Sequence, residues 1–405
     1  MDYERLDKIY YINEDDWREQ YEKRFNAPFT KHLPLKIKEF NRKNEFELFY
    51  CCNEEIVLLY DGIMSECLKL RSLLENIPPV GIEQFINACI VDEIKASNDV
   101  EGVRSSRKEI RSALYASAED RLSLRFSGII NKYLTIIDDQ KTDLNSCADI
   151  RALFDELIAD EIKIADPSNL PDGKIFRKGS VDVVSGTQKT IHRGIYPEEK
   201  IIDHMTVALS ILHDKKIPSL IGVGIFHYLF GYIHPFYDGN GRMARFITSY
   251  RLSKILQMPV VALRVSLLIK TQRKQYYDLF AVTNSERNCG DLTPFIIGTL
   301  QFIKNAVENT ERIHHVKLDN YKRFKKKIDG LNLNDRTAED VYDILLQATV
   351  FSNWGATLKD ICNTLGKSEN TVATRLKKIP ETLLIRYKEI RPYLYKINLT
   401  EWEKL

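Results

Sequence analysis

The chain has 405 residues, which is too long for one compact core and predicts two to three domains. Its 44% hydrophobic and 29% charged residues are typical of a globular protein rather than a disordered or fibrous one. A net charge of +2 and a pI of about 8.0 require neither a nucleic-acid nor a membrane partner, although a local basic patch is still compatible with one.

Seven cysteines are scattered without a CxxC pair, so neither a zinc site nor a disulfide framework is predicted. Free thiols and a charged N-terminus without a signal-peptide pattern favour a cytoplasmic location. The most apolar stretch, 217–233, contains Pro218, His227 and three glycines and is shorter than the ~20 residues of a membrane span. It is therefore predicted to be a buried core helix.

Apolar residues at helical spacing predict a mainly α-helical chain that begins with a helical region over residues 1–80. The predicted helices before residue 160 are 54–74, 81–96, 104–117 and 151–157. Partial alternation over 176–184, a turn at 185–188 and a return over 189–195 predict a short β-hairpin. A further helix begins at Tyr196-Pro, and successive helices follow to about residue 310.

The last ninety residues predict a basic linker and a small module. Six lysines and arginines lie between Lys317 and Lys327, in a segment interpreted as a linker over 316–335 or as a solvated helix face. Three predicted helices and an alternating stretch over 336–405 have the pattern of a winged helix-turn-helix. Thr371, Thr374 and Arg375 suit DNA contacts, but protein contact or dimerisation and a purely structural cap stay open.

The residues His234–Arg245 carry the strongest chemical signal, with the sequence His-Pro-Phe-Tyr-Asp-Gly-Asn-Gly-Arg-Met-Ala-Arg. Gly239 and Gly241 allow a tight turn whose amides, together with the start of the next helix, suit an anion. Arg242 and Arg245 share one face of that helix, where two guanidinium groups can hold a di- or triphosphate. The pattern predicts a phosphate site.

Two further residues of this stretch complete a set for phosphoryl or nucleotidyl transfer. Asp238 lies beside the predicted phosphate site and could hold Mg²⁺, which prefers one or two carboxylates plus phosphate oxygens. His234, at the end of an apolar helix, could take a proton from an attacking hydroxyl. A purely structural turn would not require this whole set of residue types.

The same string matches, at every specified position, the motif His-Pro-Phe-x-Asp-Gly-Asn-Gly-Arg-x-x-Arg of the Fic family, which residues 80–305 resemble. The resemblance implies a helical Fic core over 81–315 and transfer of AMP from Mg-ATP to a hydroxyl of a target protein, called AMPylation. It also implies roles for the residues of the motif. These are His234 as general base, Asp238 as Mg²⁺ ligand, Gly239, Asn240 and Gly241 at the phosphates, Arg242 at the β-phosphate and Arg245 at the γ-phosphate.

Two more features resemble the family. The hairpin at about 175–195 is similar to the family's flap, which pairs with the target segment in strand fashion; the alternative is a hairpin that only covers the core. Tyr277 either lines the adenine pocket or packs its helix.

Ser97-Asn-Asp-Val-Glu-Gly102 matches the family's inhibitory motif and precedes the catalytic motif, which is the layout of the family's class II. Ser97 and Glu101 are four residues apart on a helix predicted at about 93–102. The resemblance implies that Glu101 pairs with Arg245 and occupies the place of the γ-phosphate. The alternative is an ordinary surface glutamate near a helix end.

Three functions therefore compete. The leading one is an autoinhibited AMP transferase; the others are an enzyme that mainly removes AMP from a modified target, and a DNA-binding regulator with the Fic core as nucleotide sensor. A few relatives transfer phosphate, UMP or phosphocholine, but Asp238 and both arginines favour a triphosphate donor. The family resemblance also implies a homodimer.

Overall fold

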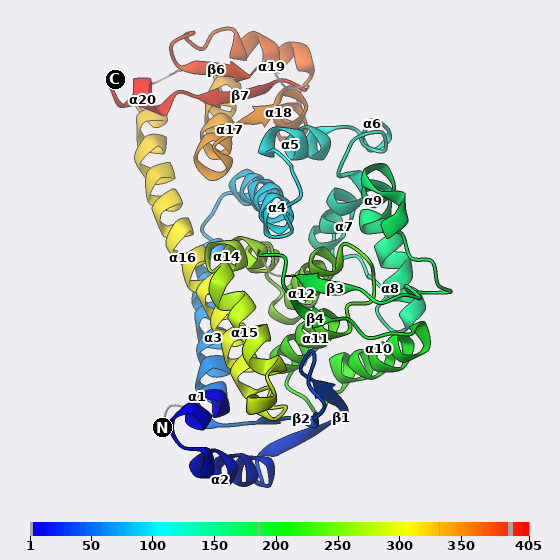
Figure 1. The fold of residues 1–405 in the computed structure, drawn as a ribbon. Coiled ribbons are helices and arrows are strands. Elements are labelled where there is room, and N and C mark those ends of the chain that lie inside the picture. The colour runs from blue at the N-terminus through cyan, green and yellow to red at the C-terminus, as the bar shows by residue number, and fades with distance from the viewer. Residues whose placement is uncertain (1–2, 185–186, 332, 388–391, 405) are drawn as a thin grey trace. The chain divides into compact units, whose positions relative to one another are not determined.

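In the computed structural model, the structure describes residues 3–184, 187–331, 333–387 and 392–404 (Figure 1). The predicted mainly helical fold is confirmed. Over the described ranges, no helix combines the length and apolarity needed to cross a membrane. The chain divides into two compact units: unit 1 holds residues 1–67, 96–103 and 131–307, and unit 2 holds 68–95, 104–130 and 308–405.

The helices that lie wholly in unit 1 form most of its core. They are α1 (Leu6–Ile12), α2 (Glu14–Phe25), α8 (Cys147–Phe154), α9 (Asp160–Ala165), α10 (Glu198–His213), α11 (Ser219–Ile233), α12 (Asn240–Leu256), α13 (Pro259–Ala262), α14 (Val265–Thr271) and α15 (Arg273–Asn284), with short η2 (Pro167–Asn169) and η3 (Glu286–Asn288). Four other helices of the described ranges have residues in both units: α3 (Glu54–Leu74), α4 (Pro79–Val100), α7 (Ser127–Ile137) and α16 (Thr293–Asp329).

Helix α11 is the centre of unit 1, and the prediction of a buried helix over 217–233 is confirmed. It packs against α10 on one side and α12 on the other. His227 in its middle is 4% exposed, with Nδ1 bonded to Thr248 Oγ1 and Nε2 to Tyr276 Oη, both at 2.8 Å. These bonds fix α11, α12 and α15 to one another, so the elements that carry the motif are rigid.

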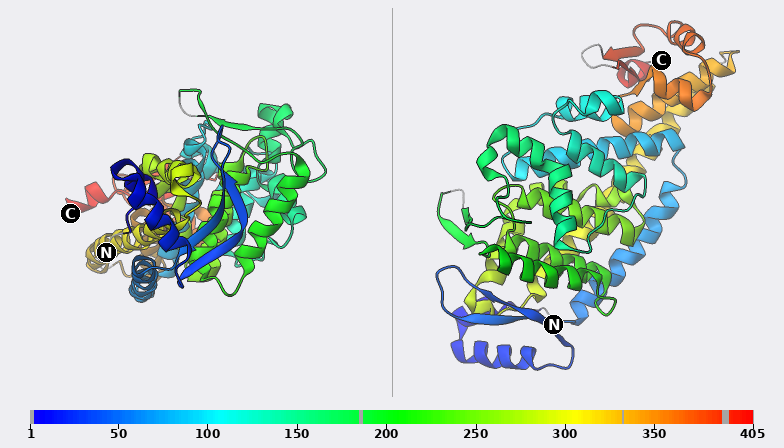
Figure 2. Two further views of the ribbon diagram at one scale, coloured as in Figure 1. Left: turned by 60° about the horizontal axis from the view of Figure 1, so that its bottom comes forward. Right: turned by 90° about the vertical axis from the view of Figure 1, so that its right-hand side faces the viewer.

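The N-terminal region was predicted to be helical, but it also contains a β-hairpin. Strands β1 (Thr30–Lys38) and β2 (Glu45–Cys51) form an antiparallel hairpin. Leu33, Leu35 and Ile37 point to the core at period two, which is the strand signal. A register shift between His32 and Lys36 interrupts the ladder and obscured that alternation. Figure 2 shows this hairpin, in dark blue, beside the green helices that include α10.

The predicted hairpin at 176–195 is present, with shorter strands than expected. Strands β3 (Asp182–Val184) and β4 (Thr190–Arg193) pair in antiparallel fashion. Residues 185–186 of the predicted turn lie outside the described residues. The helix predicted at 151–157 also differs: α8 passes into a π-helical turn, η1 (Asp155–Ala159), and then into α9. Such π turns recur at functional sites.

Unit 2 combines C-terminal elements with segments that the sequence assigned to the Fic core. Gly81 donates its N–H to Gln347 Oε1 at 3.1 Å, and the ring of Phe85 lies 4.1 Å from that of His314. Residues 81–95 and 104–130 thus group with the C-terminal part in unit 2, while the predicted domain bounds of 81–315 stay a prediction. The segment includes α5 (Arg107–Tyr115) and α6 (Ala118–Arg121), so the predicted helix at 104–117 is shorter than expected.

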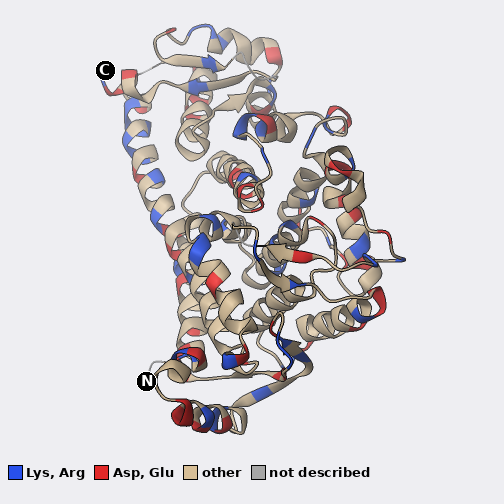
Figure 3. Cartoon of the chain, in the orientation of Figure 1, with Lys and Arg blue, Asp and Glu red and all other residues tan. Residues whose placement is uncertain are grey.

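The predicted linker at 316–335 is also different, since α16 continues through it to Asp329. Its basic residues are spread over the last turns of that helix (Figure 3), as the solvated-face alternative proposed. The elements that follow are α17 (Arg336–Ser352), β5 (Ala356–Thr357), α18 (Leu358–Leu365), α19 (Glu369–Leu376), β6 (Leu384–Tyr387), β7 (Leu394–Ile397) and α20 (Leu399–Glu403), with sheet order β5-β7-β6. Residues 388–391 of the predicted wing lie outside the described residues.

The winged-helix assignment and DNA binding by this module stay predictions. Arg375 of α19, the arginine expected to face DNA, has its Nε 3.3 Å from Asp335 Oδ2. Its guanidinium is thus engaged by a carboxylate, and a phosphate would have to replace that partner.

Candidate active site

The turn between α11 and α12 is built by two residues in left-handed backbone conformation. His234 ends α11 with φ 53° and ψ 61°, and Gly239 precedes α12 with φ 81°. A Cβ at Gly239 would overlap the side chain of Ile158 from η1. The side chain of Asn240 closes the turn, because its Oδ1 accepts from Phe236 N at 2.9 Å and its Nδ2 donates to Phe236 O at 2.7 Å.

This closure directs the first amides of α12 into one place. In the first turn of a helix the N–H groups have no preceding helical carbonyl, and they favour an anion together with the helix dipole. The Asn240 side chain is consumed by the Phe236 backbone. It therefore fixes the shape of the turn, and both Asn240 and Gly241 line the cavity described below.

The tautomer of the His234 ring follows from the contact of its Nδ1 with a backbone carbonyl. Its Nδ1 lies 3.3 Å from Gly231 O. Since a carbonyl can only accept, Nδ1 carries the proton and Nε2 keeps a lone pair. Burial, together with the nearby His192, lowers the pKa of His234 to about 4. The imidazole is therefore neutral at pH 7 and can accept a proton at Nε2.

Arg177 ties the base of the flap to the turn that carries His234. Its guanidinium is fully buried and donates to His234 O from Nε at 2.9 Å and from Nη2 at 2.8 Å, and to Ile195 O at 2.9 Å. It also bonds to Gly179 O. Burial lowers the pKa of Arg177 to about 10, so it remains charged at neutral pH. The flap and the catalytic turn are thus joined through one side chain.

All three nitrogens of the Arg245 guanidinium bond to residues of the predicted inhibitory motif. Its Nη1 donates to Glu101 Oε1 at 2.9 Å, its Nε to Ser97 Oγ at 3.0 Å and its Nη2 to Ser97 O at 3.0 Å. A Cβ added at Gly241 would overlap the Glu101 carboxylate. Glu101 therefore lies against the first turn of α12, where an anion would bind. Gly102, with φ 73°, lets the chain leave α4 directly after Glu101.

Arg242 points elsewhere. Its Nη1 lies 3.3 Å from Glu161 Oε2, and its Nη2 lies 3.9 Å from Asp238 Oδ1. The side chain is 2% exposed, and within the described part of the chain its Nε has no hydrogen-bond partner. Glu161 follows the π-helical turn η1, whose Ile158 packs on Gly239. Sequence reasoning did not anticipate Glu161 as the partner of a motif arginine.

A cavity of about 650 Å³ in unit 1 brings most of the predicted residues together. This volume is in the usual range for small-molecule sites. The predicted residues that line it are His234, Asn240, Gly241, Arg245, Glu101 and Tyr277. Ser97, Gly102, Asp238, Gly239 and Arg242 surround the site without lining this cavity. Tyr277 is 39% exposed, and the choice between its two predicted roles stays a prediction of the sequence.

The cavity also has walls that the sequence did not suggest. Asn284 and Phe280 of α15, His192 of β4 and residues 39–42 of the β1–β2 loop all line it. Only the position of Asn284, on the α15 face two turns beyond Tyr277, offered a local signal. The other groups arrive from elements distant in sequence.

Asp238 is the motif residue that fits a divalent cation. Its side chain is 47% exposed beside Arg242, and its Oδ1 accepts from Gly239 N. Among the described residues no cluster of three or more His, Cys, Asp or Glu side chains could hold a metal alone. The assignment of Asp238 to Mg²⁺, which commonly uses one carboxylate and completes its shell with phosphate oxygens and water, stays a prediction of the sequence.

Part of the chain that holds this site matches a known protein family. A model of the Fic/DOC family matches residues 146–252. The chain is 36% identical over 84 residues to the protein adenylyltransferase Fic of Drosophila grimshawi, covering 21% of this chain and 14% of that protein. It is 34% identical over 102 residues to the enzyme of the same name from Drosophila erecta, covering 25% of this chain and 17% of that protein. The matches thus span less than a fifth of these relatives.

The fold has a solved counterpart. A Fic family protein from Desulfovibrio desulfuricans G20 superposes with a TM-score of 0.53 at 21% sequence identity, over 86% of this chain and 97% of that chain. At this identity the likeness concerns the fold alone.

Proposed function

Through residues 146–252 this chain belongs to the Fic/DOC family, and we propose that it is a transferase that moves AMP from ATP to a hydroxyl side chain of a target protein. The observation that supports the proposal is the cavity itself. It places a neutral His234, with a free lone pair on Nε2, in one space with Gly241 and Arg245 at the start of α12. A proton acceptor beside an anion site is what nucleotidyl transfer requires.

The reaction is a displacement at the α-phosphorus. The target hydroxyl oxygen forms a bond to that phosphorus, the bond to the bridging oxygen breaks, and pyrophosphate leaves. The hydroxyl proton passes to Nε2 of His234, while Nδ1 keeps its bond to Gly231 O. The N–H groups at the start of α12 and the Arg245 guanidinium stabilise charge on the phosphates. Mg²⁺, held by Asp238, would neutralise charge on the leaving pyrophosphate.

We propose that the resting enzyme is autoinhibited. Glu101 bonds to Arg245 and lies against Gly241, so it competes with the terminal phosphate for the same donors. A charge-assisted bond of 2.9 Å to a guanidinium that is 1% exposed is strong enough for this competition. The flap strands β3 and β4 line the cavity and are available to align a target strand by main-chain bonds.

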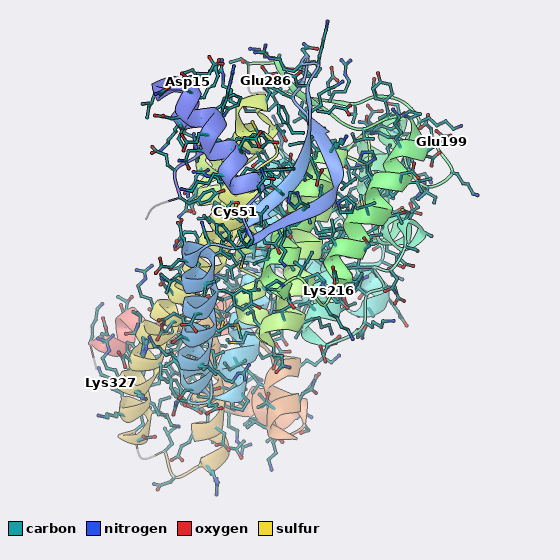
Figure 4. The ribbon with its side chains drawn as sticks, turned by 90° about the horizontal axis from the view of Figure 1, so that it is seen from below. Asp15, Cys51, Glu199, Lys216, Glu286 and Lys327 are labelled. Atoms are coloured by element: carbon teal, nitrogen blue, oxygen red, sulfur yellow. The ribbon has the colours of Figure 1, made fainter. Side chains whose placement is uncertain are left out.

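The test uses ATP labelled at the α-phosphate and mass spectrometry of the protein. Glu101→Gly should incorporate at least about tenfold more AMP than wild type, since a net charged pair of roughly 1.5–3 kcal/mol is removed. Adding His234→Ala should abolish the label. Glu199→Ala, an exposed carboxylate of α10 labelled in Figure 4, is the charge control. The proposal is contradicted if AMP is still incorporated after His234→Ala, or if Glu101→Gly incorporates no more AMP than wild type.

Removal of AMP from a modified target is the second candidate. Glu101 and His234 line the same cavity, so the carboxylate is placed to orient a water near the α-phosphate site. Wild type would then release AMP from the target that Glu101→Gly has modified, and Glu101→Gly would not. The cytoplasmic location, the homodimer and the sensor function stay predictions of the sequence.

A further inference from the structure

The β1–β2 loop, residues 39–44, contributes to the active-site cavity although it lies more than a hundred residues before the matched domain. Four consecutive residues, Glu39, Phe40, Asn41 and Arg42, line the same cavity as His234. Loops held on a rigid scaffold commonly carry recognition. The question is what this loop recognises.

The loop is fixed to the segment after α15. Glu286 N donates to Glu39 Oε2 at 2.8 Å. Arg42 Nε lies 3.6 Å from Glu286 Oε1, and Asn44 Nδ2 lies 3.5 Å from Glu286 Oε2. Figure 4 labels Glu286 close to the end of the hairpin. Both sides of the loop are therefore attached to one residue.

Two other elements hold the loop in place. Lys38 N donates to Tyr232 Oη of α11 at 2.8 Å. The guanidinium of Arg193, in flap strand β4, lies 5.3 Å from the centre of the Phe40 ring, in cation–π range. Attachments to α11, to Glu286 after α15 and to the flap make the loop a preformed part of the cavity rather than a loose cover.

The position of the loop along α15 indicates which end of a ligand it meets. Tyr277, near the start of α15, interacts electrostatically with Glu101 and Arg245, so that end of the helix is beside the phosphate site. Asn284 ends α15 and lines the cavity, and Glu286 follows with the loop. Seven residues of helix separate Tyr277 from Asn284, which is about 10 Å. A nucleotide with its phosphates on Gly241 would extend its nucleoside along this length.

We propose that the β1–β2 loop forms the wall of the nucleoside subsite and determines which base the enzyme accepts. The inference rests on the proposed function, because it requires a nucleotide with its phosphates at Gly241. Phe40 offers an apolar surface, and Asn41 and Arg42 offer donors at the rim. A polar edge that must be matched discriminates between bases more sharply than an apolar wall.

The experiment measures nucleotide binding, so that it does not depend on transfer. Calorimetric titration uses the Glu101→Gly/His234→Ala protein, in which Arg245 is released and turnover is blocked. ATP, GTP, CTP and inorganic triphosphate are the ligands. Phe40→Ala and Arg42→Ala are tested separately against Lys43→Ala, which removes an exposed cation of the same loop that does not line the cavity.

We expect Phe40→Ala or Arg42→Ala to weaken ATP binding about tenfold and to narrow the preference for ATP over GTP and CTP. Binding of triphosphate should stay within about twofold, and Lys43→Ala should match the parent. Arg42 is exposed, so its variant keeps the result interpretable if Phe40→Ala unfolds.

The outcomes separate this inference from the proposed function. If the parent binds ATP and both loop variants bind it with unchanged affinity and base preference, the loop inference is overturned and the transferase proposal stands. A change confined to the Michaelis constant of a protein acceptor would likewise overturn it, since the loop would then read the target. A parent that binds no nucleotide would remove the proposed function itself.

Discussion

Two arginines one turn apart on α12 are buried to the same degree, yet they are held in opposite ways. Arg245 is 1% exposed and uses Nε, Nη1 and Nη2 on Ser97 and Glu101 at 2.9–3.0 Å. Arg242 is 2% exposed but has only longer carboxylate contacts, at 3.3 Å to Glu161 and 3.9 Å to Asp238, and its Nε is without a hydrogen-bond partner among the described residues. Arg245 must exchange these partners before it can bind phosphate, whereas Arg242 still has an N–H group that can donate to a ligand.

The difference separates inhibition from recognition. A ligand that reaches Arg245 must displace three good hydrogen bonds, so this arginine is the natural point of control. A ligand that reaches Arg242 can accept a hydrogen bond from its buried Nε–H. This bond is favourable because a buried donor without a partner costs free energy. We therefore expect changes at Arg245 and its partners to switch activity, and changes around Arg242 to tune affinity.

The largest effect is expected from Arg245→Lys. A lysine cannot make the three divergent contacts of Arg245, and it leaves the Glu101 carboxylate and the Ser97 carbonyl poorly paired. In the Glu101→Gly background, AMP incorporation should fall at least about a hundredfold, and in wild type the free energy of unfolding should fall by about 3 kcal/mol. Labelled-ATP incorporation and denaturant unfolding measure the two effects.

Arg242→Lys, made in parallel, is the matched control for that comparison. We expect a smaller loss of transfer, because Arg242 has fewer contacts to lose. Equal losses at the two positions would mean that the partners seen in the resting structure do not decide their roles.

The second effect concerns Arg177, a third buried guanidinium, which donates to backbone carbonyls of the described residues. Arg177→Lys should break the link between flap and catalytic turn and lower the transfer rate of Glu101→Gly about tenfold to a hundredfold. ATP affinity, measured by calorimetry, should change by less than about threefold, because Arg177 does not line the cavity. A loss of affinity equal to the loss of rate would indicate general misfolding instead.

These arginines also show where sequence reasoning succeeds and where it stops. The motif His234–Arg245 is contiguous and each residue type meets a separate chemical need, so its function could be predicted. The contact of Arg245 with Glu101 followed from a family pattern in the N-terminal part. Arg177 and Glu161 meet motif residues from 57 and 81 positions away, and no local pattern encodes such pairs.

The fold divides in the same manner. The helix at 54–74 was predicted from its helical periodicity and the buried helix near 217–233 from its run of apolar residues, and both signals are local. The β1–β2 hairpin was missed because Pro34 and a register shift interrupt its alternation. The grouping of 81–95 with the C-terminal part depends on contacts such as Gly81 with Gln347, which appear only when the chain has folded.

A third, smaller effect tests the tuning role of Arg242. Glu161→Gln keeps an acceptor near Nη1 but removes the negative charge beside the phosphate site. ATP should then bind the Glu101→Gly protein roughly fivefold more tightly, since about 1 kcal/mol of competition or repulsion is removed. Asp160→Asn on the same helix is the control. Weaker ATP binding in Glu161→Gln would mean that the carboxylate positions Arg242 for phosphate and does not compete with it.

The smallest effect is expected from a change of pH. Its effect on the transfer rate reports on the base His234 and not on the contacts of Arg242 and Arg245. Burial lowers the pKa of His234 to about 4, so Nε2 is already unprotonated throughout the neutral range. The transfer rate of Glu101→Gly should therefore change less than about twofold between pH 6.5 and 8, and should fall only as pH approaches 4. An acid limb centred near the ordinary histidine pKa of about 6.5 would contradict the buried setting of His234.

Stability should respond to the same histidines in a different range. The pKa values of His234 and His227 are lowered to about 4 and about 3, and both should return to about 6.5 on unfolding. Between the folded and unfolded pKa values, the unfolded chain binds more protons than the folded chain. The free energy of unfolding therefore decreases as pH falls below about 6.5. His227→Gln should flatten this decrease without moving the acid limb of the transfer rate. His227 lies between α11, α12 and α15, while His234 faces the cavity. The pH dependence of stability therefore reports the titration of His227 in the core, and the pH dependence of the transfer rate reports that of His234.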